Sequence, residues 1–241
     1  MSYYLTIDQG NTSVKIAVFS DFDILDSRRF DSLTIEDIDE FVGNRVIRSS
    51  IYSTTRGGGD EIVEALKSRC ERVYKMSHEL LLTIEIGYEH PELLGQDRIA
   101  ACAGAAALFP FNEALVVDAG TAITYDYLSP TTLFVGGNIA PGLRMRLKSL
   151  HNYTSRLPEI DVEGRETAWG VDTETALRMG AIDGVVAEIT HYANKLTSNN
   201  KKIILTGGDA DFISKRLPIP HEVVPELVSI GLNSILLFNE Y

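Results

Sequence analysis

Residues 4–19 read YLTIDQGNTSVKIAVF, two apolar segments on either side of a polar turn that begins at Asp8. Apolar or alternating runs that flank a short glycine-containing turn predict a β-hairpin. Residues 24–30 follow a second turn and predict a third strand that pairs back on the hairpin. The chain is therefore expected to open with a three-stranded antiparallel meander.

The same pattern returns at residues 114–128, which read ALVVDAGTAITYDYL. Asp118 ends a strand before a tight turn, as Asp8 does, and residues 133–137 predict the third strand of a second meander. Two such meanders predict an internal duplication, with an N-terminal domain at 1–113 and a C-terminal domain at 114–241.

Helices and further strands follow each meander. We expect helices near 34–43, 95–108, 142–151 and 172–196, and another that starts at residues 57–60 and carries Ile62, Val63 and Leu66. We expect strands near 46–52, 72–76 and 202–206. The segment 95–108 is rich in alanine, which predicts a buried helix that packs closely on its neighbour. The long helix near 172–196 carries Gly180 and Gly184, a four-residue spacing that suits a close contact within the chain or with a second subunit. Meanders and helices, twice over, predict an α/β protein of two similar domains with a ligand cleft between them.

Composition narrows the class of protein. The chain has 241 residues, a net charge of −12 and 44% hydrophobic residues. No dense Lys/Arg cluster is present, so we expect no nucleic acid as partner. The longest run of small and apolar residues is too short to span a bilayer, and no leader pattern opens the chain, which favours a cytoplasmic protein without a membrane partner. Cys70 and Cys102 are expected to be reduced and buried.

Three turns carry the candidate chemistry. The first, Asp8 to Lys15, joins one carboxylate to several hydrogen-bond donors, which suits a phosphate chain with Mg²⁺. The second, Asp118 to Thr121, repeats that pattern. The third, Thr206-Gly-Gly208, ends a buried strand, where glycines let a flat ring or a phosphate approach the backbone. Each turn alone also suits an ordinary connection without function.

Together the three turns resemble the phosphate-1, phosphate-2 and adenosine motifs of the actin, hexokinase and Hsp70 superfamily. Over nearly its whole length the chain resembles type III pantothenate kinases more specifically. The segments that carry this resemblance are Asp8-Gln-Gly-Asn-Thr-Ser-Val-Lys15, Gly95-Gln-Asp-Arg98, Asp118-Ala-Gly-Thr121, Gly136-Gly-Asn-Ile-Ala-Pro-Gly142, Thr154-Ser-Arg-Leu-Pro158 and Thr206-Gly-Gly208. The resemblance implies duplicated ribonuclease-H-like (actin-like ATPase) domains.

It also implies ATP-dependent phosphorylation of pantothenate to 4'-phosphopantothenate, the first step of coenzyme A biosynthesis, in a homodimer. Asp97 matches the proposed general base, and Arg98 would hold the pantothenate carboxylate. Asp118 matches the ligand of a monovalent cation, K⁺ or NH₄⁺, and Asp8 would act with Mg²⁺ and phosphate. The substrate-binding set is Tyr88, Gly95, Gln96, Asp97, Arg98 and Thr173. The ATP-binding set is Asp8, Gln9, Gly10, Asn11, Thr12, Ser13, Val14, Lys15, Thr121, Gly207 and Gly208.

Alternatives remain for several of these residues. Asp97 and Arg98 also suit an ion pair that caps a helix, Tyr88 suits core packing, and Thr173 suits helix N-capping. A helix N-terminus would keep Asp97 ionised. Arg156 is a departure from the family pattern whose role the sequence leaves open.

Two other functions fit the same fold. Another small-molecule kinase, such as a sugar kinase, is disfavoured because a sugar offers no carboxylate to Arg98. A non-catalytic regulatory relative is disfavoured because Asp8, Asp97 and Asp118 are all present.

Overall fold

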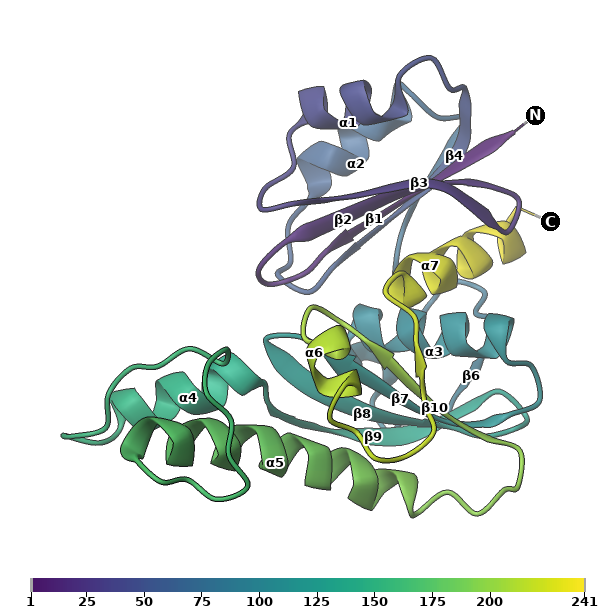
Figure 1. The fold of residues 1–241 in the computed structure, drawn as a ribbon. Helices are drawn as coiled ribbons and strands as arrows, with labels where there is room; N and C mark the ends of the chain where they lie inside the picture. Colours follow the sequence, from purple (N-terminus) through teal and green to yellow (C-terminus); the bar gives the residue numbers. More distant parts are fainter. Residues whose placement is uncertain (1, 241) are drawn as a thin grey trace. The chain divides into compact units, whose positions relative to one another are not determined.

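The computed structural model describes residues 2–240, which form two compact units. The first unit comprises residues 2–112, 128–136 and 226–240, and the second comprises Glu113–Tyr127 and Gly137–Pro225. Each unit is built on a β-sheet with helices packed against it (Figure 1). Glu113, the last residue of the predicted N-terminal domain, is the first residue of strand β7 and begins the second unit, while the first unit also includes two later segments, 128–136 and 226–240.

The elements alternate between strands and helices along the chain. Up to residue 112 they are β1 (Tyr3–Gln9), β2 (Val14–Ser20), β3 (Asp23–Phe30), α1 (Ile35–Val42), β4 (Ile47–Thr54), α2 (Asp60–Lys67), β5 (Arg72–Lys75), β6 (Glu85–Ile86), the 3₁₀ helix η1 (Pro91–Leu93) and α3 (Gln96–Leu108). After it they are β7 (Glu113–Ala119), β8 (Ala122–Leu128), β9 (Leu133–Pro141), α4 (Leu143–Asn152), α5 (Thr173–Ala193), β10 (Lys201–Thr206), α6 (Ala210–Ser214), β11 (Glu222–Val223) and α7 (Leu227–Phe238).

The strand order of the first sheet is β3-β2-β1-β4-β5. Strands β1, β2 and β3 pair antiparallel, as the opening sequence predicts, and β4 and β5 are added parallel. Asp21, in the turn between β2 and β3, has a positive φ of 52°, a conformation that Asp tolerates better than most residues.

The second sheet repeats that order. Its strands run β11-β10-β7-β8-β9-β6, so β9-β8-β7-β10-β11 matches β3-β2-β1-β4-β5 position by position. Strand β10 pairs parallel with both β7 and β11, as β4 does with β1 and β5. This repeated topology confirms the predicted α/β fold of duplicated ribonuclease-H-like domains. Strands β6 and β11 and the helix η1 are short elements that the sequence did not predict.

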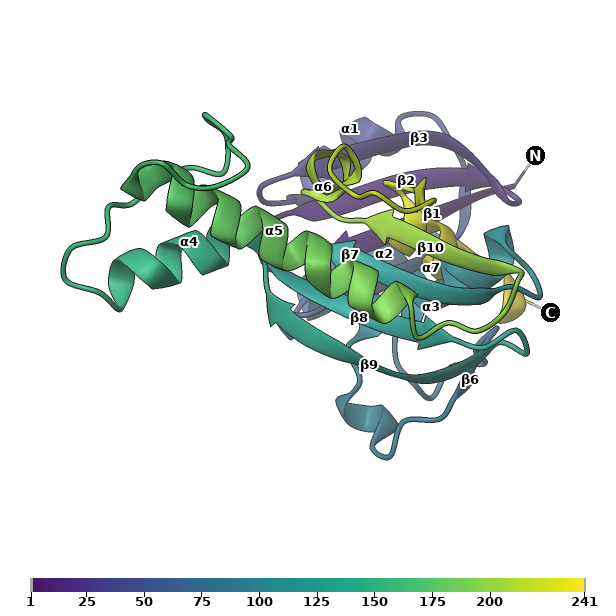
Figure 2. The same cartoon turned by 60° about the horizontal axis from the view of Figure 1, so that its bottom comes forward.

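Each sheet has its own hydrophobic core. Leu5, Ile16, Ile38, Phe41 and Leu66 join the first sheet to helices α1 and α2, all with at most 2% of their surface exposed. Full burial of one such side chain stabilises the fold by roughly 1.5–3 kcal/mol. In the second unit, apolar residues of β7, β8 and β10 pack against α5, which lies across that sheet with α4 beside it (Figure 2).

The alanine-rich helix α3 is buried, as predicted, and packs against α7. The two helices cross at Gly104 and Gly231. A Cβ atom on Gly231 would lie 1.7 Å from the carbonyl oxygen of Ala100, and one on Gly104 would lie 2.2 Å from that of Leu227. Only glycine permits this approach, because no real Cβ contact is that short.

Cys70 and Cys102 are buried and are not joined by a disulfide, as expected. Within residues 2–240, helices of sufficient length and apolar character to cross a bilayer are absent.

Candidate active site

The first turn is a hairpin loop at the ends of β1 and β2. Asp8 and Lys15 are register partners, and the Gly10 N–H donates to the Ser13 carbonyl at 3.0 Å, which closes the loop. Asn11 and Thr12 are exposed at the tip, where their polar groups can meet a ligand. Val14 is buried in the core, so only its backbone is available for the predicted contact with ATP.

Strand β4 fixes this loop from one side. The Tyr52 hydroxyl, fully buried, donates to Gln9 Oε1, and the Thr55 N–H donates to the Gln9 carbonyl at 3.1 Å. Burial raises the pKa of Tyr52, so it remains a donor at neutral pH. Gly59 touches the same ring, because a Cβ there would lie 2.1 Å from the Tyr52 hydroxyl oxygen. Tyr52 had no signal in the sequence beyond its place in an apolar strand.

A polar environment surrounds Asp8, which is half-buried. Its register partner on β4 is Ser53, whose buried hydroxyl has no hydrogen-bond partner within residues 2–240. A carboxylate beside an unsatisfied hydroxyl gives oxygen ligands, the type that Mg²⁺ prefers. These residues therefore fit the divalent cation of a kinase.

The end of β4 also connects to the start of α3. The Thr54 N–H donates to Gln96 Oε1 at 3.3 Å, and Gln96 is the first residue of that helix. The structure thus brings together, within one unit, the first turn and the predicted catalytic segment Gly95–Arg98.

Asp97 lies in the first turn of α3 next to a residue that must be small. Its Oδ1 accepts a hydrogen bond from the Arg98 N–H at 2.9 Å. A Cβ on Gly95 would lie 2.5 Å from the same oxygen, so only glycine leaves room for this carboxylate. Gly95 occupies the N-cap position without a side-chain cap, and Asp97 instead satisfies one of the first-turn N–H groups.

Burial is the largest influence on Asp97 and raises the pKa of its carboxyl group. The Arg98 N–H and the Arg98 charge lower the pKa, but by less. The sequence-based expectation was that the helix N-terminus keeps Asp97 ionised, but this effect is smaller than that of burial and opposes it. A raised pKa makes the carboxylate a stronger proton acceptor than an exposed aspartate.

Arg98 is 6% exposed and lies against two aromatic rings. Its guanidinium carbon is 5.8 Å from the centre of the Tyr88 ring and 5.6 Å from that of Phe134. The two rings meet edge to face, 6.1 Å apart. Tyr88 is half-buried, so its packing on Phe134 and its predicted contact with substrate are compatible. No motif or pattern in the sequence pointed to Phe134.

The second and third turns meet in the other unit. Asp118 and Thr206 are register partners on β7 and β10, and the Asp209 N–H donates to the Ala119 carbonyl at 2.9 Å. Gly207 has a φ of +92°, and a Cβ there would lie 2.4 Å from Asp118 Oδ1. Gly208 and Thr121 are exposed beside them. The structure therefore joins these two predicted turns into one cluster.

Gly142 closes this cluster at the start of α4. Its N–H donates to the Thr121 carbonyl at 3.0 Å, and a Cβ there would lie 2.4 Å from the Gly120 carbonyl oxygen. The final glycine of the Gly136–Gly142 segment thus sets the shape of the second turn.

Thr173 is the first residue of α5 and is exposed. The helix is capped by Asp172, whose Oδ1 accepts from the Thr175 N–H at 2.8 Å, so the N-capping alternative for Thr173 was wrong. The reason is a one-residue offset, since both Asp and Thr are good caps and Asp172 comes first.

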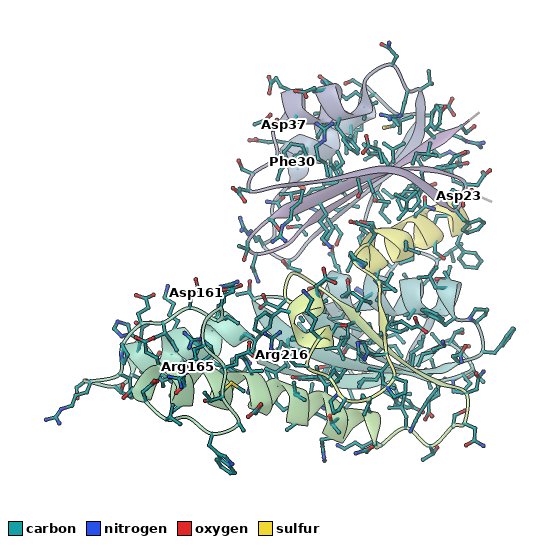
Figure 3. All side chains as sticks on the ribbon, viewed as in Figure 1. Asp23, Phe30, Asp37, Asp161, Arg165 and Arg216 are labelled. Atoms are coloured by element: carbon teal, nitrogen blue, oxygen red, sulfur yellow. The ribbon has the colours of Figure 1, made fainter. Side chains whose placement is uncertain are left out.

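The loop between α4 and α5, residues 153–172, is held by ion pairs. Arg144 pairs with Asp161 at 2.6 Å, Arg216 pairs with Glu166, and the buried Arg178 donates to the Arg165 carbonyl (Figure 3 labels Asp161, Arg165 and Arg216). Arg156 is exposed on this loop. A surface cavity of about 380 Å³ is lined by this loop together with Arg144 and Lys148, and another of about 330 Å³ lies in the first unit. Neither is lined by predicted site residues.

Two sheets that share one order of five strands, each with an Asp-x-Gly turn after its first strand, define the fold of the actin-like ATPases. Solved structures agree with this assignment. A putative Baf family transcriptional activator from Campylobacter jejuni matches with a TM-score of 0.68 and 25% identity, over 98% of both chains. A putative 2-dehydro-3-deoxygalactonokinase from Sinorhizobium meliloti has a TM-score of 0.59 at 14% identity, over 96% of this chain and 97% of its own, which shows the fold alone.

Within this fold class the chain belongs to the type III pantothenate kinase family. The family model for type III pantothenate kinase matches residues 4–195. The type III pantothenate kinase of Porphyromonas gingivalis is 37% identical over 245 residues, which cover 99% of this chain and all of the relative. That of Flavobacterium johnsoniae is 38% identical over 216 residues, 88% of each chain.

Proposed function

We propose that this protein transfers the γ-phosphoryl group of ATP to the hydroxyl of pantothenate, with Asp97 as the general base. The observation that carries the proposal is the Asp97–Arg98 pair at the start of α3. One residue is a half-buried carboxylate whose pKa is raised by desolvation, and the next is a buried guanidinium, in a chain whose family is pantothenate kinase. The product is 4'-phosphopantothenate, from which coenzyme A is made.

Asp97 accepts the proton of the attacking hydroxyl. The hydroxyl oxygen forms a bond to the γ-phosphorus, the bond from that phosphorus to the β,γ-bridging oxygen breaks, and ADP leaves. Because this transition state is loose, the proton departs late and a carboxylate is a sufficient base. Gly95 keeps the space beside Oδ1 open, so the carboxylate can hold this position.

Arg98 recognises the carboxylate of pantothenate. A guanidinium binds a carboxylate through two parallel N–H···O bonds, which fixes orientation as well as charge. Tyr88 contributes its half-buried ring and hydroxyl to the same substrate, and Thr173 its exposed hydroxyl. Gly95 and Gln96 complete the substrate-binding set, with Gln96 held by Thr54.

ATP is held by the turns. The backbone N–H groups and side chains of Gly10 to Ser13, with Lys15, bind phosphate oxygens, while Asp8 holds Mg²⁺, directly or through water. The cation neutralises the charge that develops on the phosphates. Thr121, Gly207 and Gly208 bind ATP from the cluster that contains Asp118. That carboxylate is a suitable ligand for K⁺ or NH₄⁺.

We also propose a cytoplasmic homodimer. Helix α5 supports this, because a Cβ on Gly180 would have no atom within 4 Å and one on Gly184 would meet only Arg146. Gly184 lies close to Arg146 of α4 in the same chain, so the intrachain explanation still holds for that glycine, while Gly180 is the position that leaves room for a second subunit. Sedimentation velocity on the purified protein tests the dimer, and a single monomer peak at assay concentration would contradict it.

The substitution Asp97→Asn tests the catalytic assignment. The variant should keep its fold and its ATP affinity while losing at least 100-fold in kcat, because a general base contributes roughly 10²–10⁴-fold. Asp60→Asn is a matched control, since Asp60 also lies in the first turn of a helix but pairs with Lys75 on the surface. Near-normal turnover by Asp97→Asn would show that Asp97 is not the base.

A further inference from the structure

Arg98 is enclosed by two rings that come from different segments of the chain. Tyr88 follows the two-residue strand β6, and Phe134 lies on β9 with none of its surface exposed. Both ring centres are within 5.8 Å of the guanidinium carbon, and both residues share one compact unit with Arg98. The guanidinium therefore contacts two aromatic rings in addition to its polar contacts.

A short parallel pairing brings these rings together. Strand β6 pairs with β9 through Glu85–Leu133 and Ile86–Phe134. The Gly87 N–H continues the pairing by donating to the Phe134 carbonyl at 2.8 Å. A Cβ on Gly87 would lie only 3.1 Å from that carbonyl oxygen, so the glycine allows the close approach. The position of Tyr88 is thus tied to the backbone of Phe134.

Such an arrangement has a specific physical effect on arginine. The guanidinium is a flat cation that is attracted to the face of an aromatic ring, with greater strength where water is excluded. Contact with two rings restricts the rotamers of a side chain that otherwise loses about 2 kcal/mol of conformational entropy when it is ordered. Ordering the guanidinium before the ligand arrives lowers the entropy cost of binding.

We propose that Phe134 is a positioning residue that orients Arg98 and thereby sets the preference of the site for a carboxylated substrate. This inference rests on the proposed function, in which Arg98 binds the pantothenate carboxylate. Phe134 acts through Arg98 and contacts no reacting atom. Its loss should therefore weaken recognition of the carboxylate and leave the phosphoryl-transfer step intact.

The test compares pantothenate with pantothenol, in which a hydroxymethyl group replaces the carboxylate. In Phe134→Leu, which removes the ring but keeps an apolar side chain, KM for pantothenate should rise roughly 2- to 30-fold at nearly constant kcat. KM for pantothenol should stay within about 2-fold, since that substrate gives Arg98 no anion to bind. The ratio of the two kcat/KM values, wild type against variant, is the decisive readout.

Phe41→Leu is the matched control. Phe41 is 2% exposed, belongs to the same unit and has the Arg28 guanidinium 5.4 Å from its ring centre, but Arg28 has no predicted role in the site. The Phe41→Leu variant should change neither the ratio of the two kcat/KM values nor the KM for either substrate. Phe134→Met serves in place of Phe134→Leu should the latter fail to fold.

An equal loss on both substrates, or an unchanged ratio in a folded variant, would overturn the positioning role. Failure of the unaltered protein to phosphorylate pantothenate would overturn the proposed function, and this inference with it.

Discussion

Gly207 offers a quantitative test of how the third turn shapes the site. In Gly207→Ala the new Cβ would lie 2.4 Å from Asp118 Oδ1 and 2.6 Å from the Ala119 carbonyl carbon. Since real Cβ contacts are essentially never under 3.0 Å, the oxygen must move by at least 0.6 Å. Alanine at a φ of +92° adds about 1–2 kcal/mol of backbone strain, and overpacking adds roughly 1–3 kcal/mol.

Ala119 lies within strand β7, which is paired with β10, so its backbone has little freedom to yield. The displacement should therefore fall on the Asp118 carboxylate and the turn that follows it. Misplacement of about 1 Å at a catalytic site can reduce the rate about 100-fold. We expect Gly207→Ala to lose about 2–5 kcal/mol of unfolding free energy and about 100-fold in kcat/KM for ATP, and to lose activation by K⁺.

Urea unfolding and steady-state kinetics measure these effects, and two variants separate their causes. Gly43→Ala has positive φ but its nearest Cβ contact is 3.9 Å, so it should lose stability without a change in KM. Gly142→Ala has ordinary φ but meets the Gly120 carbonyl at 2.4 Å, so it should affect kinetics through the clash alone. A folded Gly207→Ala with kcat/KM within 2-fold of wild type would refute this reasoning.

Two further predictions concern the pKa of Asp97 and the crossing of α3 with α7. Because the base must be deprotonated, kcat/KM should fall as pH decreases through the raised pKa of Asp97; a pH–rate profile in which Asp97→Asn keeps the same acidic limb would contradict this assignment. The pKa of Asp97 is higher in the folded state than in the unfolded state, so its carboxyl group contributes less to the free energy of unfolding as the pH rises from the unfolded to the folded pKa. Chemical denaturation should therefore find Asp97→Asn more stable than wild type above this pH interval, and no more stable below it. Gly231→Ala should cost several kcal/mol of unfolding free energy, since its Cβ would lie 1.7 Å from the Ala100 carbonyl oxygen; a melting temperature equal to that of the unaltered protein would disprove the close crossing.

Most strands and helices could be predicted from the sequence because the spacing of apolar residues and the turn residues determine local structure. The alternation of residues 4–19 and its repeat at 114–128 located both meanders, and apolar spacing located the main helices. Short elements escaped prediction because β6 and β11 each have two residues, too few for a periodic pattern, and form only because another strand is beside them.

Some residues of the candidate site could also be predicted from the sequence, and others could not. Motif residues such as Asp8, Asp97 and Asp118 were identifiable because family resemblance marks them in the sequence. Tyr52 and Phe134 were not, since their roles depend on contacts with Gln9 and Arg98 across 43 and 36 positions of the chain. The direction of the Asp97 pKa shift was also missed, because desolvation of the carboxyl group in the folded chain outweighs the local effect of the helix terminus.

The predicted division into domains 1–113 and 114–241 stays a prediction, and so does the predicted ligand cleft. Packing of α7 against α3 depends on glycines 127 positions apart, Gly104 and Gly231, and no local pattern signals such a pairing. Residue roles in ATP, cation and substrate binding likewise remain proposals that the variants above examine individually.

Assay of the purified protein with ATP and Mg²⁺ tests the central claim most directly. ADP release is followed with pantothenate, glucose and N-acetylglucosamine as acceptors, with and without K⁺, and the product is weighed by mass spectrometry. We predict turnover with pantothenate alone, raised by K⁺, and a product heavier by one phosphoryl group. Turnover of a sugar, or no turnover of any acceptor by folded protein, would contradict the account, and the latter would favour a regulatory role for the fold.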